Sequence, residues 1–154
     1  MNPYLFLDFD GVLHPQYEGQ AAPADVAFCH LPRFEAVMRD FPSVEIVISS
    51  TWRLQFSLDN LRARFSVDIG GRVVGATPVP DPFAPPLPEQ RETEILAWLS
   101  ANDRQHVPWI ALDDAFWEFK RHRDRVVVCK SYVGLDDVVA GKLRAALMMC
   151  SVAS

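Results

Sequence analysis

The sequence predicts an α/β domain in which helices cover a mainly parallel sheet of about five strands. Two observations predict this class: short apolar runs rich in β-branched residues recur along the chain, and segments with helical periodicity alternate with them. Strands buried on both faces of a parallel sheet have this continuous apolar character. At 154 residues, 49% of them hydrophobic, the chain is expected to form one domain over residues 1–154.

Strands are expected wherever apolar residues run on without alternation. The first run is followed by Gly11, which fits a turn directly after a buried strand. The expected strands are Tyr4–Asp8, Val44–Ser49, Val107–Asp113, Arg125–Lys130 and, from a weaker pattern, Arg72–Ala76.

Helices are expected between these strands, because apolar residues there recur at i, i+3, i+4 and i+7. Pro32 fits the first turn of one helix, whose apolar face contains Phe34, Val37, Met38 and Phe41. The other expected helices lie at Leu54–Phe65, around Ile95–Leu99, and along Leu135–Leu147.

Charge, cysteine content and hydropathy exclude several classes of protein. A net charge of −5 gives no broad basic surface for nucleic acid, so any such contact would be local. The cysteines Cys29, Cys129 and Cys150 are too scattered for a disulfide framework or a metal pair, and we expect three buried thiols. No secretory signal or membrane-spanning run is evident, so a cytoplasmic location without a membrane partner is expected.

Polar residues gather where the apolar runs end. Asp8 and Asp10 end the first run, Ser49 and Ser50 the second, and the Asp113–Asp114 pair follows the run from Val107. In an open parallel sheet, ligands bind beyond the carboxyl ends of the strands, so these groups are expected to share one edge. Clustered carboxylates without histidine or cysteine favour Mg²⁺, which usually also takes phosphate oxygens.

A cation is expected beside these carboxylates to neutralise a phosphoryl group. Arg91, at the start of the helix before the Asp113 strand, is the best candidate, since its guanidinium can bind phosphate through two hydrogen bonds. Arg53 and Lys130 compete with it: Arg53 follows the serines and either contacts substrate or faces solvent, and Lys130 ends a strand.

The four motifs together resemble the haloacid dehalogenase (HAD) superfamily, whose members are mostly Mg²⁺-dependent phosphatases and phosphotransferases. The motifs are "DFDGVL" from Asp8, "VIS" ending at Ser49, Arg91, and "IALDD" ending at Asp114. The segments "SSTWR", "RETEI" and "VGL" look closest to the HAD domain of Swiss Army Knife RNA repair proteins. The resemblance implies a three-layer Rossmann-like fold and a phosphorylated substrate, with nucleic-acid ends as one class.

The resemblance also implies roles for these residues. Asp8 would be the nucleophile that forms an aspartyl phosphate, and Asp10 the general acid and base. Mg²⁺ would be held by the side chains of Asp8 and Asp113, the backbone carbonyl of Asp10, and Asp114. Ser49 and Arg91 would hold phosphoryl oxygens, with Ser50 competing for the place of Ser49. Lysine is usual in the superfamily where Arg91 stands.

The resemblance further implies an essentially capless enzyme, because neither usual place for a lid is long. Residues 14–30 can form a flap, and Thr77–Pro88, with six of the twelve prolines, is expected to be an extended connecting loop rather than a peptide ligand. The open alternatives are a phosphotransferase, a non-catalytic HAD-fold protein and a receiver-like signalling module. The order of the aspartates argues against the receiver.

Simpler structural roles are also open to the same residues. Asp113 or Asp114 could cap a short helix, Ser50 and Thr51 could cap a helix near Trp52, and Asp136 and Asp137 could cap the last helix. His14 is expected to be a structural residue of a turn, not a catalytic one. The tryptophans Trp98, Trp109 and Trp117 and the phenylalanines are expected in the core.

Overall fold

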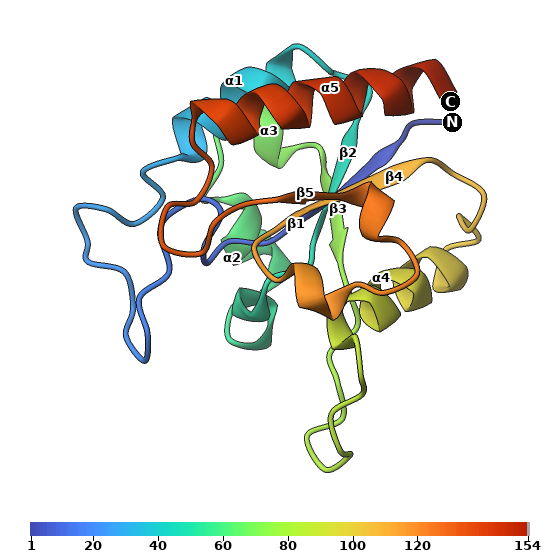
Figure 1. Ribbon diagram of the computed structural model, residues 1–154, viewed down its shortest axis with the longest axis horizontal. Coiled ribbons are helices and arrows are strands. Elements are labelled where there is room, and N and C mark those ends of the chain that lie inside the picture. The colour runs from blue at the N-terminus through green and yellow to red at the C-terminus, as the bar shows by residue number, and fades with distance from the viewer. Residues whose placement is uncertain (154) are drawn as a thin grey trace.

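The computed structural model describes residues 1–153 and contains one open, five-stranded sheet (Figure 1). All four strand pairings are parallel, and the strand order is β3-β2-β1-β4-β5. This confirms the predicted fold class and all five predicted strands. The strands are β1 (Tyr4–Leu7), β2 (Glu45–Ile48), β3 (Val73–Ala76), β4 (Trp109–Asp113) and β5 (Val126–Val128).

Helices cover both faces of the sheet and complete the three layers. In Figure 1, α1 and α5 lie together on one side, with α4 on the other. The α-helices are α1 (Leu31–Arg39), α2 (Leu58–Arg62), α3 (Val67–Gly70), α4 (Gln90–Ala101) and α5 (Asp137–Ala153). Three short 3-10 helices accompany them: η1 (Thr51–Leu54), η2 (Phe116–Glu118) and η3 (Arg123–Arg125).

Each face of the sheet has its own hydrophobic core, because successive strand residues point to opposite sides. Leu5 and Leu7 of β1 pack in the larger core, which also holds Phe34 of α1 and Leu143 of α5. Phe6, between them in the sequence, packs in the smaller core against Trp98 of α4, with ring centroids 5.7 Å apart. The strands are therefore buried on both faces, as their unbroken apolar runs predicted.

The expectation of one continuous helix over Leu54–Phe65 is wrong. The segment instead contains the end of η1, then α2 and a turn. The break lies at Ser57, whose side chain accepts a hydrogen bond from the backbone N–H of Asn60 and starts α2 afresh. A side chain that caps a helix in this way competes with continuation of the preceding one. Similarly, α5 begins at Asp137, with Asp136 accepting from Val139 N–H, so Leu135 precedes the helix.

Two expectations about burial are also wrong. Cys29 is exposed, while Cys129 and Cys150 are buried as expected. Among the aromatic residues expected in the core, Trp117 and Phe116 are 59% and 49% exposed because they stand on η2 outside the sheet layers, and Phe83 in the proline-rich loop is 95% exposed. Within residues 1–153, no helix combines the length and apolar character needed to span a membrane.

Candidate active site

The strand register brings the predicted residues together at the carboxyl edge of the sheet. Leu7, the last residue of β1, pairs with Ile48 of β2 and Leu112 of β4. One residue further along, Ser49 N–H donates to the Leu7 carbonyl and Asp8 N–H donates to the Leu112 carbonyl, at 3.0 and 3.1 Å. From β1 the chain continues to β2 and β3 on one side of it and then returns to β4 and β5 on the other. Parallel α/β sheets open a crevice for ligands at the point where the strand order reverses in this way.

Three buried carboxylates form the centre of the site. Oxygens of Asp8, Asp113 and Asp114 all lie within 4.8 Å of one another. Gly11 makes this approach feasible: its φ is +76°, and a Cβ atom there would lie 2.2 Å from Asp114 Oδ2. The backbone turn after β1 therefore needs glycine both for its conformation and for the space that Asp114 occupies.

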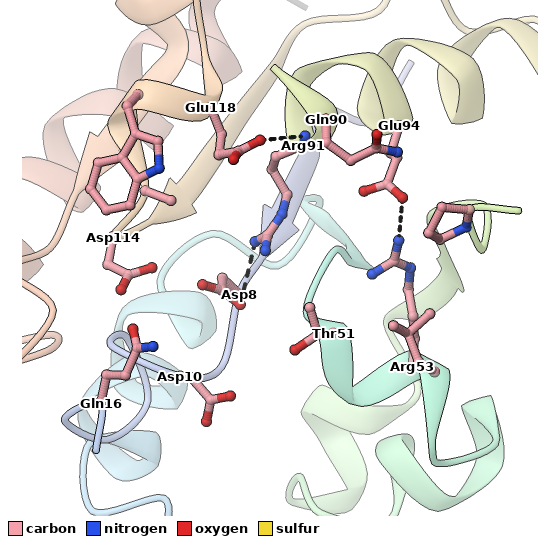
Figure 2. A pocket seen from close by; sticks show the side chains of 14 residues that line it. Asp8, Asp10, Gln16, Thr51, Arg53, Gln90, Arg91, Glu94, Asp114 and Glu118 are labelled. Carbon is pink, nitrogen blue, oxygen red and sulfur yellow. Dashed lines mark hydrogen bonds and ion pairs between the residues drawn. The ribbon is translucent and has the colours of Figure 1, made fainter. Parts of the chain in front are cut away.

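Arg91 is the cation that pairs directly with this acidic cluster. Its Nη1 lies 2.7 Å from Asp113 Oδ2, and its side chain is 13% exposed. The same atom lies 3.4 Å from Asp8 Oδ1 (Figure 2). Burial and the neighbouring Asp113 raise the pKa of Asp8 well above its usual value, although Arg91 acts in the opposite direction. Burial likewise raises the pKa of Asp113 against the effect of Arg91. One guanidinium thus offsets only part of the cluster's charge.

Arg53 also reaches the cavity, but its donors are already used. Its guanidinium donates to the carbonyls of Thr77, Ser49, Ser50 and Pro78, and to Glu94 Oε2 at 2.6 Å. Only 4% of the Arg53 side chain is exposed. Burial, and secondarily Arg91, lower the pKa of Arg53 while Glu94 opposes them. These contacts tie η1 to the end of β3 and to α4 and leave Arg53 few donors for a ligand.

Lys130 and the two serines are distinguished by their surroundings. Lys130 lies two residues beyond the end of β5, so it does not end a strand as expected. Its side chain is exposed and does not line the cavity. Ser50 Oγ accepts from Trp52 N–H and caps η1, which confirms the capping role considered for it. Ser49 Oγ, by contrast, is buried and has no hydrogen-bond partner within residues 1–153.

Asp10 stands apart from the three clustered carboxylates. Its side chain is 41% exposed and receives hydrogen bonds from His14 and from Trp52. The hydrogen bond from His14 lowers the pKa of Asp10, with a smaller lowering from Trp52, and together they outweigh the opposite effect of burial. The two aspartates of "DFD" therefore have opposite environments: the pKa of Asp8 is raised and that of Asp10 is lowered.

A cavity of about 360 Å³ is lined by Asp8, Asp10, Asp114, Arg53 and Arg91, though not by Ser49 or Asp113, and also by residues that the sequence did not single out. Glu118 accepts from Arg91 N–H at 3.2 Å, and Glu94 binds Arg53, as Figure 2 shows. Glu94 lies one helical turn after Arg91, and that spacing was the only sequence signal for it. The wall is completed by the side chains of Gln16, Thr51, Leu54, Pro80, Gln90, Ala115 and Trp117.

The acidic cluster has the chemistry of a site for a hard cation. Its three ligand atoms are all carboxylate oxygens, and no thiol or imidazole belongs to the group found within residues 1–153. Asp113 did not prove to be a helix cap, because η2 begins after Ala115 without a side-chain cap; Asp113 Oδ1 instead accepts from Ala115 N–H at 2.9 Å. That hydrogen bond orients Asp113 while its second oxygen faces Arg91.

The order of these residues and their place at the sheet edge agree with a comparison against protein families. Residues 4–140 match the profile of the HAD domain in Swiss Army Knife RNA repair proteins. The chain belongs to this HAD family. Membership supports a hydrolase or phosphatase of the HAD type in general, and members of the superfamily typically depend on a metal. No curated protein matches the chain significantly.

Proposed function

We propose that this HAD domain is a Mg²⁺-dependent phosphomonoester hydrolase. The observation that carries the proposal is the placement of Asp8 at the end of β1, with carboxylates and Arg91 on one side and Ser49 on the other. Anionic phosphoryl oxygens need positive charge and hydrogen-bond donors around them, and a nucleophile must lie among these groups. Arg91 supplies charge, and the Ser49 hydroxyl is a donor with no other partner in the described chain.

Asp8 and Asp10 would divide the chemistry between them. An Asp8 carboxylate oxygen attacks phosphorus, the bond from phosphorus to the leaving oxygen breaks, and that oxygen takes a proton from Asp10. Asp10 then removes a proton from water, whose oxygen attacks phosphorus and releases phosphate from Asp8. Mg²⁺ held by Asp8, Asp113, Asp114 and the Asp10 carbonyl would polarise the phosphoryl group. Arg91 and Ser49 would hold its oxygens throughout.

Release of inorganic phosphate from 4-nitrophenyl phosphate in the presence of Mg²⁺ tests this function. We expect turnover by the wild type and a loss on the order of 10³-fold or more for Asp8→Asn, which removes the nucleophile. Asp59→Asn is a matched control, since Asp59 is exposed and pairs only with Arg62. Unchanged activity of Asp8→Asn would contradict the mechanism. Absence of turnover on a broad panel of phosphate esters would favour a non-catalytic protein.

For the substrate, we propose a phosphate at the end of a nucleic-acid strand. Exposed aromatic and basic residues lie beside the site: Trp117 lines the cavity, and Phe116 next to it is 49% exposed. Lys120 and Arg121 follow, and neither forms an ion pair with an acid in residues 1–153. Exposed aromatic rings beside cationic side chains suit stacking on bases and contact with phosphates. The name of the matched family, which refers to RNA repair, supports the same class.

The loop that carries the basic residues has a fixed backbone. Glu92, the neighbour of Arg91 on α4, is buried, and its carboxylate accepts from the backbone N–H groups of Lys120, Arg121 and His122 at 2.9–3.3 Å. The loop therefore wraps around an internal anion, and its basic side chains are held beside the helix that carries Arg91. Lys120 and Arg121 would thus provide a local basic contact for nucleic acid on a chain whose net charge is −5.

Kinetics with a phosphorylated oligonucleotide and with 4-nitrophenyl phosphate test the substrate class. Phe116→Ala and Lys120→Gln should each lower kcat/KM for the oligonucleotide about tenfold and leave the small ester nearly unchanged, because neither residue lines the cavity and only the longer substrate reaches them. Activity on the oligonucleotide should also fall with salt concentration. Equal effects on both substrates would contradict the proposed class.

The cytoplasmic location expected from the sequence also stays a prediction.

A further inference from the structure

Asp10 is held by two N–H donors that come from separate segments of the chain. His14 Nε2 lies 2.7 Å from Asp10 Oδ1, and Trp52 Nε1 lies 3.1 Å from both Oδ1 and Oδ2. His14 belongs to the turn after β1, and Trp52 to η1 after β2. Neither residue lines the cavity beside Asp8 and Arg91 or belongs to the acidic cluster. Both contact the Asp10 carboxylate, and both also pack against the Phe28 ring.

The donor role of His14 follows from its second ring nitrogen. The backbone N–H of Phe28 donates to His14 Nδ1 at 3.2 Å, so Nδ1 acts as an acceptor and the proton of the neutral ring is on Nε2. The Nε2–H group therefore donates to Asp10. Phe28 itself has a φ of +58°, a left-handed conformation that is unfavourable for an aromatic residue. The 14–30 segment thus adopts a strained backbone at the residue that orients the imidazole.

Packing holds both rings in place. The His14 side chain is 1% exposed and packs edge-on against the Phe28 ring, at a centroid distance of 5.3 Å. The Trp52 indole contacts Phe9, Phe28 and Phe56 with centroids 5.2–5.6 Å apart. Rings packed in this way lose few rotamers when they donate a hydrogen bond, so the directions of their N–H groups are set by the fold. Together they restrict the rotation of the Asp10 carboxylate.

The two oxygens of Asp10 are unequally engaged. Oδ1 accepts from both His14 and Trp52, while Oδ2 shares only the Trp52 N–H group. A proton on Oδ1 would compete with the His14 N–H group for the same oxygen, whereas Oδ2 has an unoccupied lone pair. Oδ2 is therefore the oxygen better suited to carry a proton.

We propose that His14 and Trp52 are positioning residues that orient Asp10 so that its Oδ2 atom exchanges the proton with the leaving group. The proposal rests on the proposed phosphatase function. In the first half of the reaction the Oδ2–H bond breaks and the proton passes to the leaving oxygen; in the second half Oδ2 accepts a proton from the attacking water. His14 and Trp52 each keep the N–H proton that they donate to Asp10 in both halves.

Leaving-group dependence distinguishes this role from a general contribution to folding. A poor leaving group such as phenol needs protonation as its bond to phosphorus breaks, whereas 4-nitrophenol departs readily as an anion. His14→Leu and Trp52→Phe should therefore lower kcat/KM for phenyl phosphate about 10- to 100-fold, and that for 4-nitrophenyl phosphate less than threefold. The ratio kcat/KM is used because it includes bond cleavage and excludes hydrolysis of the aspartyl phosphate.

Conservative variants and a remote control sharpen the test. His14→Gln places an amide N–H donor near the position of Nε2 and should recover most activity on phenyl phosphate, while Trp52→Phe keeps an aromatic ring but lacks the donor. His106→Gln is the control, because His106 is exposed and precedes the amino end of β4, whereas the site lies at the carboxyl end of that strand. Thermal unfolding establishes whether each variant is folded, and Trp52→Phe decides the question if His14→Leu does not fold.

Each outcome has a separate meaning. A steeper dependence on leaving-group pKa in His14→Leu or Trp52→Phe, with recovery in His14→Gln, supports the positioning role. An equal loss on both esters, or a change in KM alone, overturns it while leaving the phosphatase function intact. If the wild type hydrolyses neither ester nor any other phosphate monoester, the proposed function fails and the positioning role fails with it.

Discussion

Arg53 and Arg91 reach the same cavity and pair with buried carboxylates, yet their surroundings differ (Figure 2). Arg53 has one carboxylate partner, Glu94, and four backbone carbonyls that accept from it. Arg91 faces the acidic cluster, and within residues 1–153 its side-chain hydrogen bonds are to carboxylates alone. Charge is balanced around Arg53, while negative charge is in excess around Arg91.

The difference shows why a buried arginine is not by itself a binding residue. A guanidinium has five N–H donors in a fixed plane, and those of Arg53 are spent on joining η1, β3 and α4. Arg91 lies where further charge is needed, beside Asp8 and Asp113. We therefore assign Arg53 to stability and Arg91 to the substrate, and the assignment can be tested in decreasing order of effect.

The largest expected effect is on stability. Arg53→Met leaves Glu94 as a buried carboxylate without its cation, and leaves the carbonyls of Ser49 and Thr77 without a donor. The free energy of unfolding should fall by about 3–5 kcal/mol, measured by urea denaturation. Arg144→Met is the control: its partner Asp40 is 61% exposed, so the loss should stay below about 1 kcal/mol. Equal midpoints for the two variants would contradict the structural role of Arg53.

The next effect is on catalysis. Arg91→Met removes the cation next to Asp8 and should lower kcat for 4-nitrophenyl phosphate by about 10²- to 10³-fold in saturating Mg²⁺. Arg91→Lys keeps the charge and should retain activity within about tenfold of the wild type, because a point charge still neutralises the phosphoryl group. If Arg91→Met keeps full activity with an unchanged KM, the substrate-binding cation must be another residue.

A smaller effect is expected from metal binding to the excess carboxylates. Mg²⁺ at about 100 times its dissociation constant should add about 2.7 kcal/mol to the wild type's stability, seen as a rise in Tm of several degrees. Asp114→Asn should abolish this rise, since it removes one of the three clustered carboxylates. Glu94→Gln, which alters the balanced pair at Arg53, should leave the response to Mg²⁺ intact. A Tm that does not respond to Mg²⁺ would argue against the metal site.

The sequence predicted the parts of this site that depend on strand positions. Apolar runs identified all five strands, and parallel strands bring Asp8, Ser49 and Asp113 to one edge whatever the details of the loops. What it could not predict depends on contacts between loops. Nothing in "SSTWR" shows that Arg53 would find four carbonyls, and a lone buried hydroxyl at Ser49 is visible only in the folded chain.

The errors have the same origin. Helical periodicity continued from Leu54 to Phe65, but the local hydrogen bond of Ser57 ended one helix and began another. Trp117 looked like a core residue by composition, although its place on η2 leaves it at the cavity mouth. His14, by contrast, lies in the turn after β1 as expected, and its spacing of four residues from Asp10 was visible; the contact of the second donor, Trp52, was not, because Trp52 lies 42 residues from Asp10.

The smallest expected effects separate Ser49 from Ser50. Ser49→Ala removes a buried hydroxyl that has no partner in the described chain, so stability should stay level or rise by up to about 1 kcal/mol, while kcat falls because a donor to the phosphoryl group is lost. Ser50→Ala removes the cap of η1 and should cost about 1 kcal/mol with little change in kcat. Urea denaturation and phosphate release on both variants measure the two effects. A fall in kcat in Ser50→Ala and not in Ser49→Ala would exchange the two assignments. Ser50, and not Ser49, would then be the hydroxyl that donates to the phosphoryl group.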